Sequence, residues 1–195
     1  MSTTRLEAFS DGVIAILITI MVLEFKTPEG HDWSALVPLT PKFSAYALSF
    51  VFIGIYWNNH HHMLHLTHRV TGGILWANLH LLFWLSLIPF STAWMGETLL
   101  APLPTAVYGT VLLLAGAAFT ILEYLIIASQ GERSPLKAAV GIDKKGKASV
   151  LLYALAIPVA FARPWMSAAI YVVVALLWLV PDRRIEAHLK AAEHS

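Results

Sequence analysis

The stretch R-L-E-A-F-S-D-G-V-I-A-I-L-I-T-I-M-V-L, residues 5–23, decides the fold of this chain. Arg5 and Asp11 stand at its beginning, and from Gly12 onward Thr19 is its one polar residue. A helix needs about 20 predominantly apolar residues to cross a bilayer. Charges at the mouth of such a helix are costly, so they are rarely kept without a partner or a task. The stretch therefore predicts a first transmembrane helix with a charged entrance.

The composition of the whole chain is that of a membrane protein. Of its 195 residues, 57% are hydrophobic and 13% are charged, and the mean hydropathy is +0.67. A soluble domain is about 25% charged. The absence of cysteine excludes disulfides, thiolate metal sites and cysteine nucleophiles. A net charge of +1 gives no reason to propose a nucleic-acid partner.

Apolar segments separated by proline, glycine and charged residues divide the rest of the chain. They predict an all-α membrane protein with a single domain, residues 1–195, of six transmembrane helices at about 5–25, 41–66, 72–95, 105–129, 148–162 and 164–181. The last two are expected to form a tight hairpin, because Pro164 ends or kinks a helix at Arg163. One long bent helix with an interfacial piece is the alternative.

The basic residues predict the orientation of the chain. With both termini in the cytoplasm, ten basic residues fall inside and three outside, which is the usual positive-inside bias. The outside three are Lys26, Lys42 and Arg163, and the inside ten are Arg5, Arg69, Arg133, Lys137, Lys144, Lys145, Lys147, Arg183, Arg184 and Lys190.

Polar residues gather at the cytoplasmic end of the first three predicted helices. The second helix carries W-N-N-H-H-H, residues 57–62, and the third begins with Asn78 and His80. In lipid such groups must find partners, so we expect a hydrogen-bonded network that joins the helices. Its candidate members are Arg5, Asp11, Trp57 and the histidines. Alternatively, Asp11 and the histidines only sit at the headgroup interface.

The first helix presents two faces at helical spacing. One carries Gly12, Ile16, Thr19 or Ile20, and Leu23, and the other carries Asp11, Ala15, Ile18 and Val22. From the residues alone the first face is an ordinary lipid-facing or packed stripe. Further along, Glu123 lies within two turns of the cytoplasmic end of the fourth predicted helix. Three interpretations of Glu123 remain: its side chain snorkels to the interface, it pairs with a basic residue, or it has a functional role.

The motif formed by Arg5, Phe9, Ser10 and Asp11 resembles the signature of the transmembrane protein 175 family of potassium channels. Supporting segments are Y-W-N-N-H-H in the second predicted helix and N-L-H-L-L-F-W-L-S-L-I-P-F in the third. The resemblance covers the whole chain, which has one six-helix copy, as the prokaryotic members do.

This resemblance implies a homotetramer with a central pore lined by the four first helices. The T-V-G-Y-G filter of ordinary potassium channels is absent, and aliphatic side chains form the constriction instead. Carried over by distance from the motif, Ile16 is the narrowest ring, Ile20 and Leu23 form further rings, and Thr19 lies near the ion path. The resemblance gives a structural role in the polar network to Arg5, Phe9, Ser10, Asp11, Trp57, His60, His61 and Asn78. Which of His60, His61 and His62 joins it is left open.

The expected function is passive conduction of potassium and other monovalent cations across the plasma membrane, with modest selectivity for potassium over sodium. No catalytic residue, metal or cofactor is expected, and the expected partners are other copies of the chain, the bilayer and the permeant ions. One alternative is a secondary or proton-coupled transporter, which usually has a charged site at the midplane. Another is a membrane metalloenzyme with a histidine box built from His60, His61, His62, His65 and His68.

Overall fold

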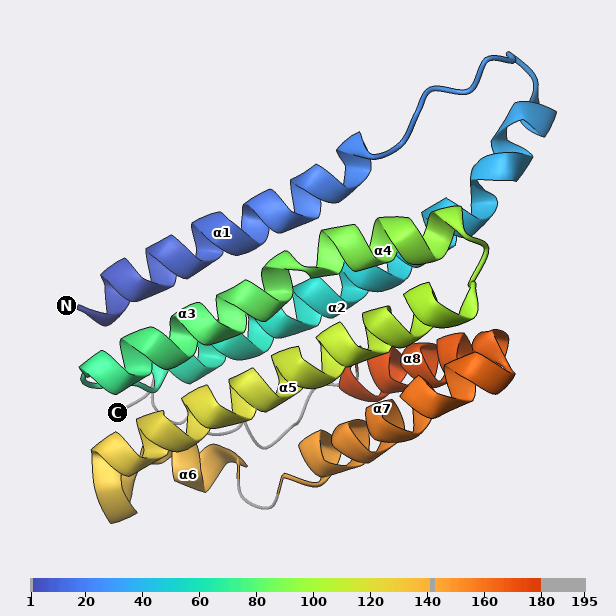
Figure 1. Ribbon diagram of the computed structural model, residues 1–195. Helices are drawn as coiled ribbons and strands as arrows, with labels where there is room; N and C mark the ends of the chain where they lie inside the picture. Colours follow the sequence, from blue (N-terminus) through green and yellow to red (C-terminus); the bar gives the residue numbers. More distant parts are fainter. Residues whose placement is uncertain (1, 141–142, 180–195) are drawn as a thin grey trace.

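A computed structural model describes residues 2–140 and 143–179 of the chain (Figure 1). The described residues are helical, with loops between the helices and no strand among them. In order, the elements are α1 (Thr3–Leu23), η1 (Trp33–Leu39), α2 (Thr40–His65), α3 (Gly72–Ser86), α4 (Ile88–Glu97), α5 (Pro102–Gln130), η2 (Gly131–Arg133), α6 (Pro135–Val140), α7 (Lys144–Ala162) and α8 (Pro164–Leu179).

Local sequence explains where several helices begin and end. The Ser2 side chain accepts a hydrogen bond from the backbone N–H of Arg5, which caps α1, and the Thr71 side chain caps α3 in the same way. Proline occupies the first turn of α2, α4 and α5, where its missing N–H costs no helical hydrogen bond. Gly131 ends α5 with a φ of 72°, a conformation that favours glycine.

Five helical segments are long and apolar enough to cross a membrane in the part of the chain that the structure describes. They are Thr3–Leu23, Trp33–His65, Gly72–Glu97, Pro102–Gln130 and Lys145–Ala162. The helix α8 is apolar but has only 16 residues. The chain is thus a helical membrane protein with several membrane-capable helices.

Three features depart from the expected helices. The segment expected as one helix over 72–95 is divided at Leu87 into α3 and α4, because Pro89 has no N–H to offer the carbonyl of Leu85. The chain before α2, expected as a loop, contains the 3-10 helix η1. The helix α7 begins at Lys144, four residues before the expected start, where the Asp143 side chain accepts a hydrogen bond from the N–H of Gly146 at 2.7 Å.

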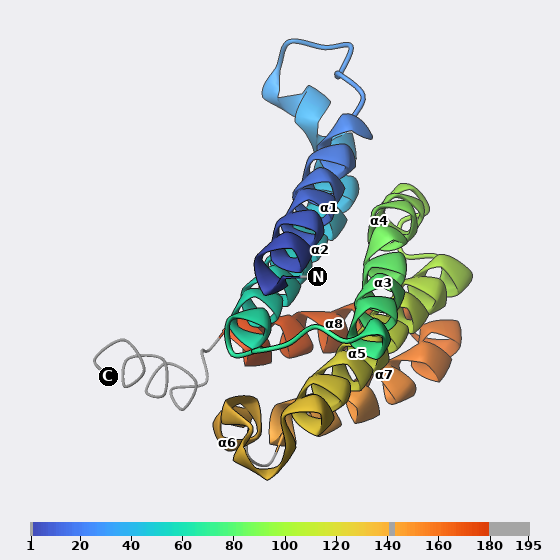
Figure 2. The ribbon, with the colours of Figure 1, turned by 90° about the vertical axis from the view of Figure 1, so that its left-hand side faces the viewer.

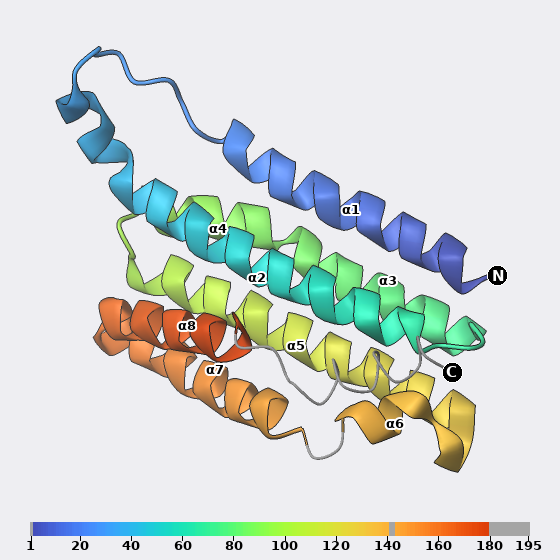
Figure 3. The same ribbon diagram turned by 180° about the vertical axis from the view of Figure 1, so that it is seen from behind.

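The helices lie side by side along one common direction (Figure 1). The helix α1 lies at one edge of the bundle and packs on α2, α3 and α4, while α7 and α8 lie at the opposite edge (Figures 1 and 3). Viewed towards the N-terminus, α1 and α2 form one group, and α3, α4 and α5 form a second that meets α7 (Figure 2). One side of α1 is therefore left without a neighbour in the single chain.

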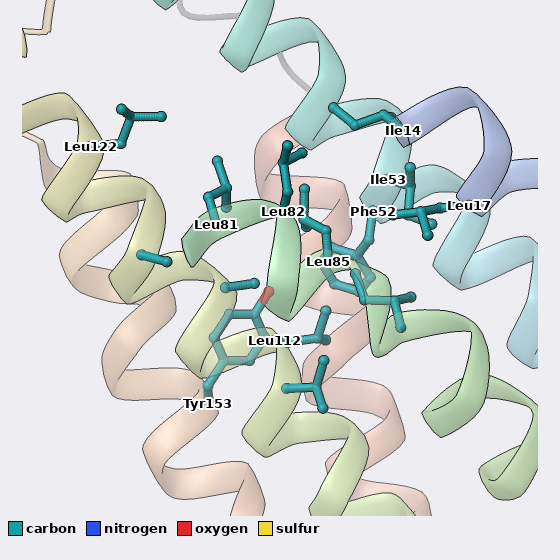
Figure 4. Packing of buried hydrophobic residues seen from close by; sticks show 14 of the residues in the cluster. Ile14, Leu17, Phe52, Ile53, Leu81, Leu82, Leu85, Leu112, Leu122 and Tyr153 are labelled. Carbon is teal, nitrogen blue, oxygen red and sulfur yellow. The ribbon is translucent and has the colours of Figure 1, made fainter. Parts of the chain in front are cut away.

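The core runs between these groups and is built of aliphatic side chains with a few aromatic rings (Figure 4). From α1, Ile14 and Leu17 join a buried cluster that includes Ile53 of α2 and Leu85 of α3 (Figure 4). Lipid tails are as apolar as these side chains, so close van der Waals packing, and not exclusion from water, holds the helices together.

The contact between α5 and α8 depends on one glycine. The hydroxyl of Tyr171, a fully buried residue of α8, donates a hydrogen bond to the carbonyl of Thr105 at 3.0 Å. Its ring passes directly over Gly109 of α5, and a Cβ added there would overlap the Tyr171 hydroxyl oxygen. Only glycine therefore allows this close approach.

Gly109→Ala is expected to destabilise the protein by about 1–3 kcal/mol, the usual cost of an overpacked interior. The thermal unfolding midpoint of the detergent-solubilised protein measures the effect. Gly54→Ala is the matched control, because a Cβ at Gly54 would meet no atom within 4 Å. Equal midpoints for the two variants would contradict the packing argument.

Candidate functional site

A fully buried hydrogen-bonded chain joins the start of α1 to α2 and α3. The amide nitrogen of Asn78 donates to Oγ of Ser10 at 3.0 Å, and the Asn78 oxygen lies 2.7 Å from Nε2 of His60. Because the amide nitrogen serves Ser10, the oxygen accepts from a protonated His60 Nε2. The Ser10 hydroxyl donates in turn to the carbonyl of Leu6 at 2.9 Å. Three helices are thus tied together at one depth.

Two further contacts join α1 to α2 at the edge of this chain. The indole N–H of Trp57 donates to Asp11 Oδ1 at 3.0 Å, and Nδ1 of His61 lies 2.7 Å from Glu7 Oε1. The rings of Trp57 and His61 stack with centroids 6.2 Å apart. Glu7 was not expected in the network. It precedes Asp11 by one helical turn, so the spacing i, i+4 placed both carboxylates on one face of α1.

The structure thus brings together six of the eight predicted network residues and leaves two apart. Arg5 and Phe9 are both exposed on α1 in the single chain. Within the described residues the Arg5 side chain forms no hydrogen bond or ion pair. A role for Arg5 and Phe9 in the network stays a prediction. Of the three adjacent histidines, His60 and His61 contact α3 and α1, and His62 lines a cavity on the other side of α2.

A double-mutant cycle on Glu7 and His61 tests whether their contact joins α1 to α2. Glu7→Gln and His61→Gln are each expected to lower stability, and the double variant to lose less than the sum of both. The coupling should be about 0.5–1 kcal/mol, since the pair is partly exposed to solvent. Unfolding by denaturing detergent in mixed micelles measures it. Strict additivity would mean that the contact contributes nothing.

Beyond this cluster, α1 has one packed face and one bare face. Ile14, Leu17 and Met21 are buried against the bundle. Ile16 is 56% exposed and Leu23 is 80% exposed. Ile20 and Thr19 are exposed on the same side, and the Thr19 hydroxyl donates to the carbonyl of Ile16 at 2.9 Å. The four predicted pore residues therefore share the side of α1 that no other helix covers.

The far end of α1 is held by a lysine that the sequence did not single out. Lys42 of α2 forms an ion pair with Glu97 of α4 at 2.7 Å and donates to the backbone carbonyl of Glu24, the last-turn cap of α1. Its ammonium group also lies 5.9 Å from the centre of the Phe25 ring. The one signal for this role in the sequence was that Lys42 is a single basic residue before an apolar run.

The histidine-rich segment forms no metal-binding cluster in residues 2–140 and 143–179: no group of three or more suitable side chains converges there. His60 is engaged by Asn78, and His61 by Glu7. The isolated His80 accepts a hydrogen bond at Nε2 from Trp84 at 2.9 Å. Each of these three rings thus has one nitrogen engaged by a protein side chain.

An apolar helix with one bare face, anchored at one end by buried polar groups and set in a bundle of membrane-length helices, is the architecture of a helical membrane channel. Residues 5–89 match the family described as "Endosomal/lysosomal potassium channel TMEM175". The chain belongs to this family of transmembrane channels. The resemblance seen in the first-helix motif is confirmed, and because the family consists of ion channels, the chain is not an enzyme.

The relatives agree in name and in fold. A potassium channel of Chryseobacterium sp. (strain P1-3) is 53% identical over 190 residues, which cover 97% of this chain and 99% of that protein. The crystal structure of a lysosomal potassium-selective channel TMEM175 homologue from Chamaesiphon minutus matches with a TM-score of 0.79 at 32% identity, covering 91% of this chain and 96% of the other. The human endosomal/lysosomal proton channel TMEM175 is 37% identical over 73 residues, 31% of this chain and 14% of that protein.

Proposed function

We propose that this chain forms a homotetrameric, potassium-permeable cation channel of the plasma membrane, with a pore lined by α1 of each subunit. The observation that carries the proposal is the bare aliphatic stripe on α1, at Ile16, Ile20 and Leu23. The names of the bacterial relatives support potassium as the permeant ion. The pore needs no cofactor, because a passive ion path requires only a shaped and wetted passage.

Each subunit, on this proposal, crosses the membrane six times with both termini in the cytoplasm. The start of α1, the turn from α2 to α3 and the end of α5 lie at one end of the bundle (Figures 1 and 3). The segment η1 and the turns from α4 to α5 and from α7 to α8 lie at the other. The positive-inside bias assigns the first end to the cytoplasm. The described part of the sixth helix, α8, covers 16 of its residues.

The bare stripe can face a central pore because of where α1 lies. It stands at the edge of the bundle and contacts its neighbours along one side only (Figure 2). Four copies placed around an axis would bring four stripes together, with Ile16 as the narrowest ring. Such a ring closes by dewetting and offers no carbonyl oxygens to replace a hydration shell, so selectivity for potassium over sodium is modest. The Thr19 hydroxyl supplies one oxygen per subunit near the path.

The polar contacts at the start of α1 are structural on this proposal. Ser10, Asn78 and His60 fix the depth and rotation of α1, and the contacts of Asp11 and Glu7 with α2 reinforce them. Fixing the rotation matters because turning α1 by one residue, about 100°, would move Ile16 off the axis. The ions meet the aliphatic stripe and not the charged entrance.

Flux from proteoliposomes tests this function directly. Purified protein should release potassium faster than sodium down a gradient and respond to voltage without any counter-substrate. A requirement for a coupled gradient would favour the secondary transporter instead. Crosslinking of the protein in membranes should give four subunits, and a ladder that ends at two would contradict the tetramer.

The names of the vertebrate relatives favour proton conduction as a second candidate. A pH-sensitive dye inside the same proteoliposomes measures it. Proton entry that persists when potassium is replaced by an impermeant cation would make the chain a proton channel. Proton entry that appears only as the counter-movement to potassium efflux would leave potassium as the permeant ion.

A further inference from the structure

A large cavity lies on the side of the bundle away from α1. It has a volume of about 710 Å³ and is lined by α2, α5, α6, α7 and α8, whereas α1 contributes no lining residue. Figures 1 and 3 show α1 and α7 at opposite edges of the bundle. Sites for small organic molecules enclose about 300–1,000 Å³, so the cavity is of a size for one such molecule.

The two ends of the cavity differ in chemistry. Aromatic side chains line one part, among them Phe50, Phe119 and Tyr153. Polar and charged side chains gather at the end nearer the turn from α2 to α3, among them Asn58, His62, Glu123, Asp143 and Lys145. Along α2 the two ends are about 18 Å apart, from Phe50 to His62 at the helical rise. The cavity is therefore amphipathic, with one polar end and one apolar end.

Among the described residues that line the polar end, carboxyl groups outnumber ammonium groups. Two carboxyl groups, those of Glu123 and Asp143, accompany the one ammonium group of Lys145. Asp143 is held by the N–H of Gly146, and Lys145 lies 6.0 Å from the centre of the Trp178 ring. The Glu123 carboxyl group has no hydrogen bond or ion pair within the described residues, and its burial disfavours the charged carboxylate unless a cation lies beside it. A partly buried carboxylate in this position favours a cation beside it.

We propose that this cavity binds a hydrophobic organic monocation, with its charge beside Glu123 and Asp143 and its apolar body against the aromatic side chains. The rings supply dispersion contact and, at their faces, further attraction for a cation. An organic anion or a phosphate headgroup would meet the two carboxylates instead. Because α1 does not line the cavity, a molecule bound there leaves the proposed pore open. This inference does not rest on the pore assignment.

Tetraphenylphosphonium is the probe, and tetraphenylborate, of matched size and opposite charge, is its control. With the purified full-length protein in lipid nanodiscs, equilibrium dialysis against empty nanodiscs isolates binding to the protein from partition into lipid. The phosphonium ion should bind saturably with about one molecule per chain, and the borate should not. Equal saturable binding of both ions, or no saturable binding of the phosphonium ion, would overturn the proposal.

Two variants locate the site. Glu123→Gln removes one carboxylate and should weaken phosphonium binding by about tenfold, the scale of one partly screened charge pair. Gly54→Leu places a side chain in the cavity, where a Cβ meets no atom within 4 Å, and should reduce binding without removing a charge. Glu132→Gln is the matched control, because Glu132 is exposed, lies outside the cavity and pairs with Lys137. Unchanged affinity in both cavity variants would overturn the proposal, as would a co-purified phospholipid that the probe cannot displace.

Discussion

Ile16→Asn is expected to raise potassium flux through the channel and to reduce its preference for potassium over sodium. An amide in place of the aliphatic side chain gives water a hydrogen-bond partner at the ring that we propose to be the narrowest, so the ring stays wet. A barrier lower by about 1.4 kcal/mol raises the flux about tenfold. Single-channel recording in planar bilayers, with potassium on one side and sodium on the other, measures both conductance and selectivity.

Val22→Asn is the matched control for this prediction. Val22 is exposed on the same helix, but it stands about 120° around the axis from Ile16. The same chemical change there should leave conductance and selectivity as they are. If Val22→Asn had the larger effect, α1 would present a different face to the ions, and if neither variant changed conduction, α1 would not line the constriction.

Asn78→Ala is expected to give the largest loss of stability among polar substitutions in the bundle. It breaks both hydrogen bonds of Asn78 at once, since Ser10 loses a donor and His60 Nε2 loses its acceptor. His60 Nδ1 already has no partner among the described residues, so the ring would be left buried with neither nitrogen bonded. The free energy of unfolding should fall by about 1–3 kcal/mol. Values in the lower half of this range are more usual for hydrogen bonds between membrane helices.

The thermal midpoint, read by size-exclusion chromatography after heating, measures this loss, and flux of the folded fraction measures its effect on the pore. Asn59→Ala is the control, because within the described part of the chain the Asn59 amide donates only to the carbonyl of Ile55 in its own helix. Combining Ser10→Ala with Asn78→Ala should add little to the single change, since both break the same hydrogen bond. Full additivity would contradict a shared network.

Helical spacing was sufficient to find some parts of the site. It separated the Ile16 face of α1 from the Asp11 face, because side chains on one helix are ordered by 100° per residue whatever surrounds them. It also placed Trp57, His60 and Asn78 near one end of their helices. It could not say which histidine meets which partner, because the hydrogen bonds of His60 and His61 cross to residues 18 and 54 positions away.

Other elements were missed for the same reason. Glu7 lay in the opening motif, but its partner was not evident until α1 and α2 were packed together. The ion pair of Lys42 with Glu97 joins residues 55 positions apart. The close approach of Tyr171 to Gly109 depends on two helices meeting at one point. Periodicity orders the faces of one helix but carries no information on the neighbour of each face.

The order and composition of residues were enough to identify a helical membrane protein of the TMEM175 family. The apolar composition indicates the membrane, and the motif from Arg5 to Asp11 indicates the family. The tertiary structure decided which polar groups meet, which side of α1 stays bare and where a cavity opens behind α2. These depend on how helices distant in the sequence are rotated against one another. That rotation is set by the summed packing of all of them, which no single segment encodes.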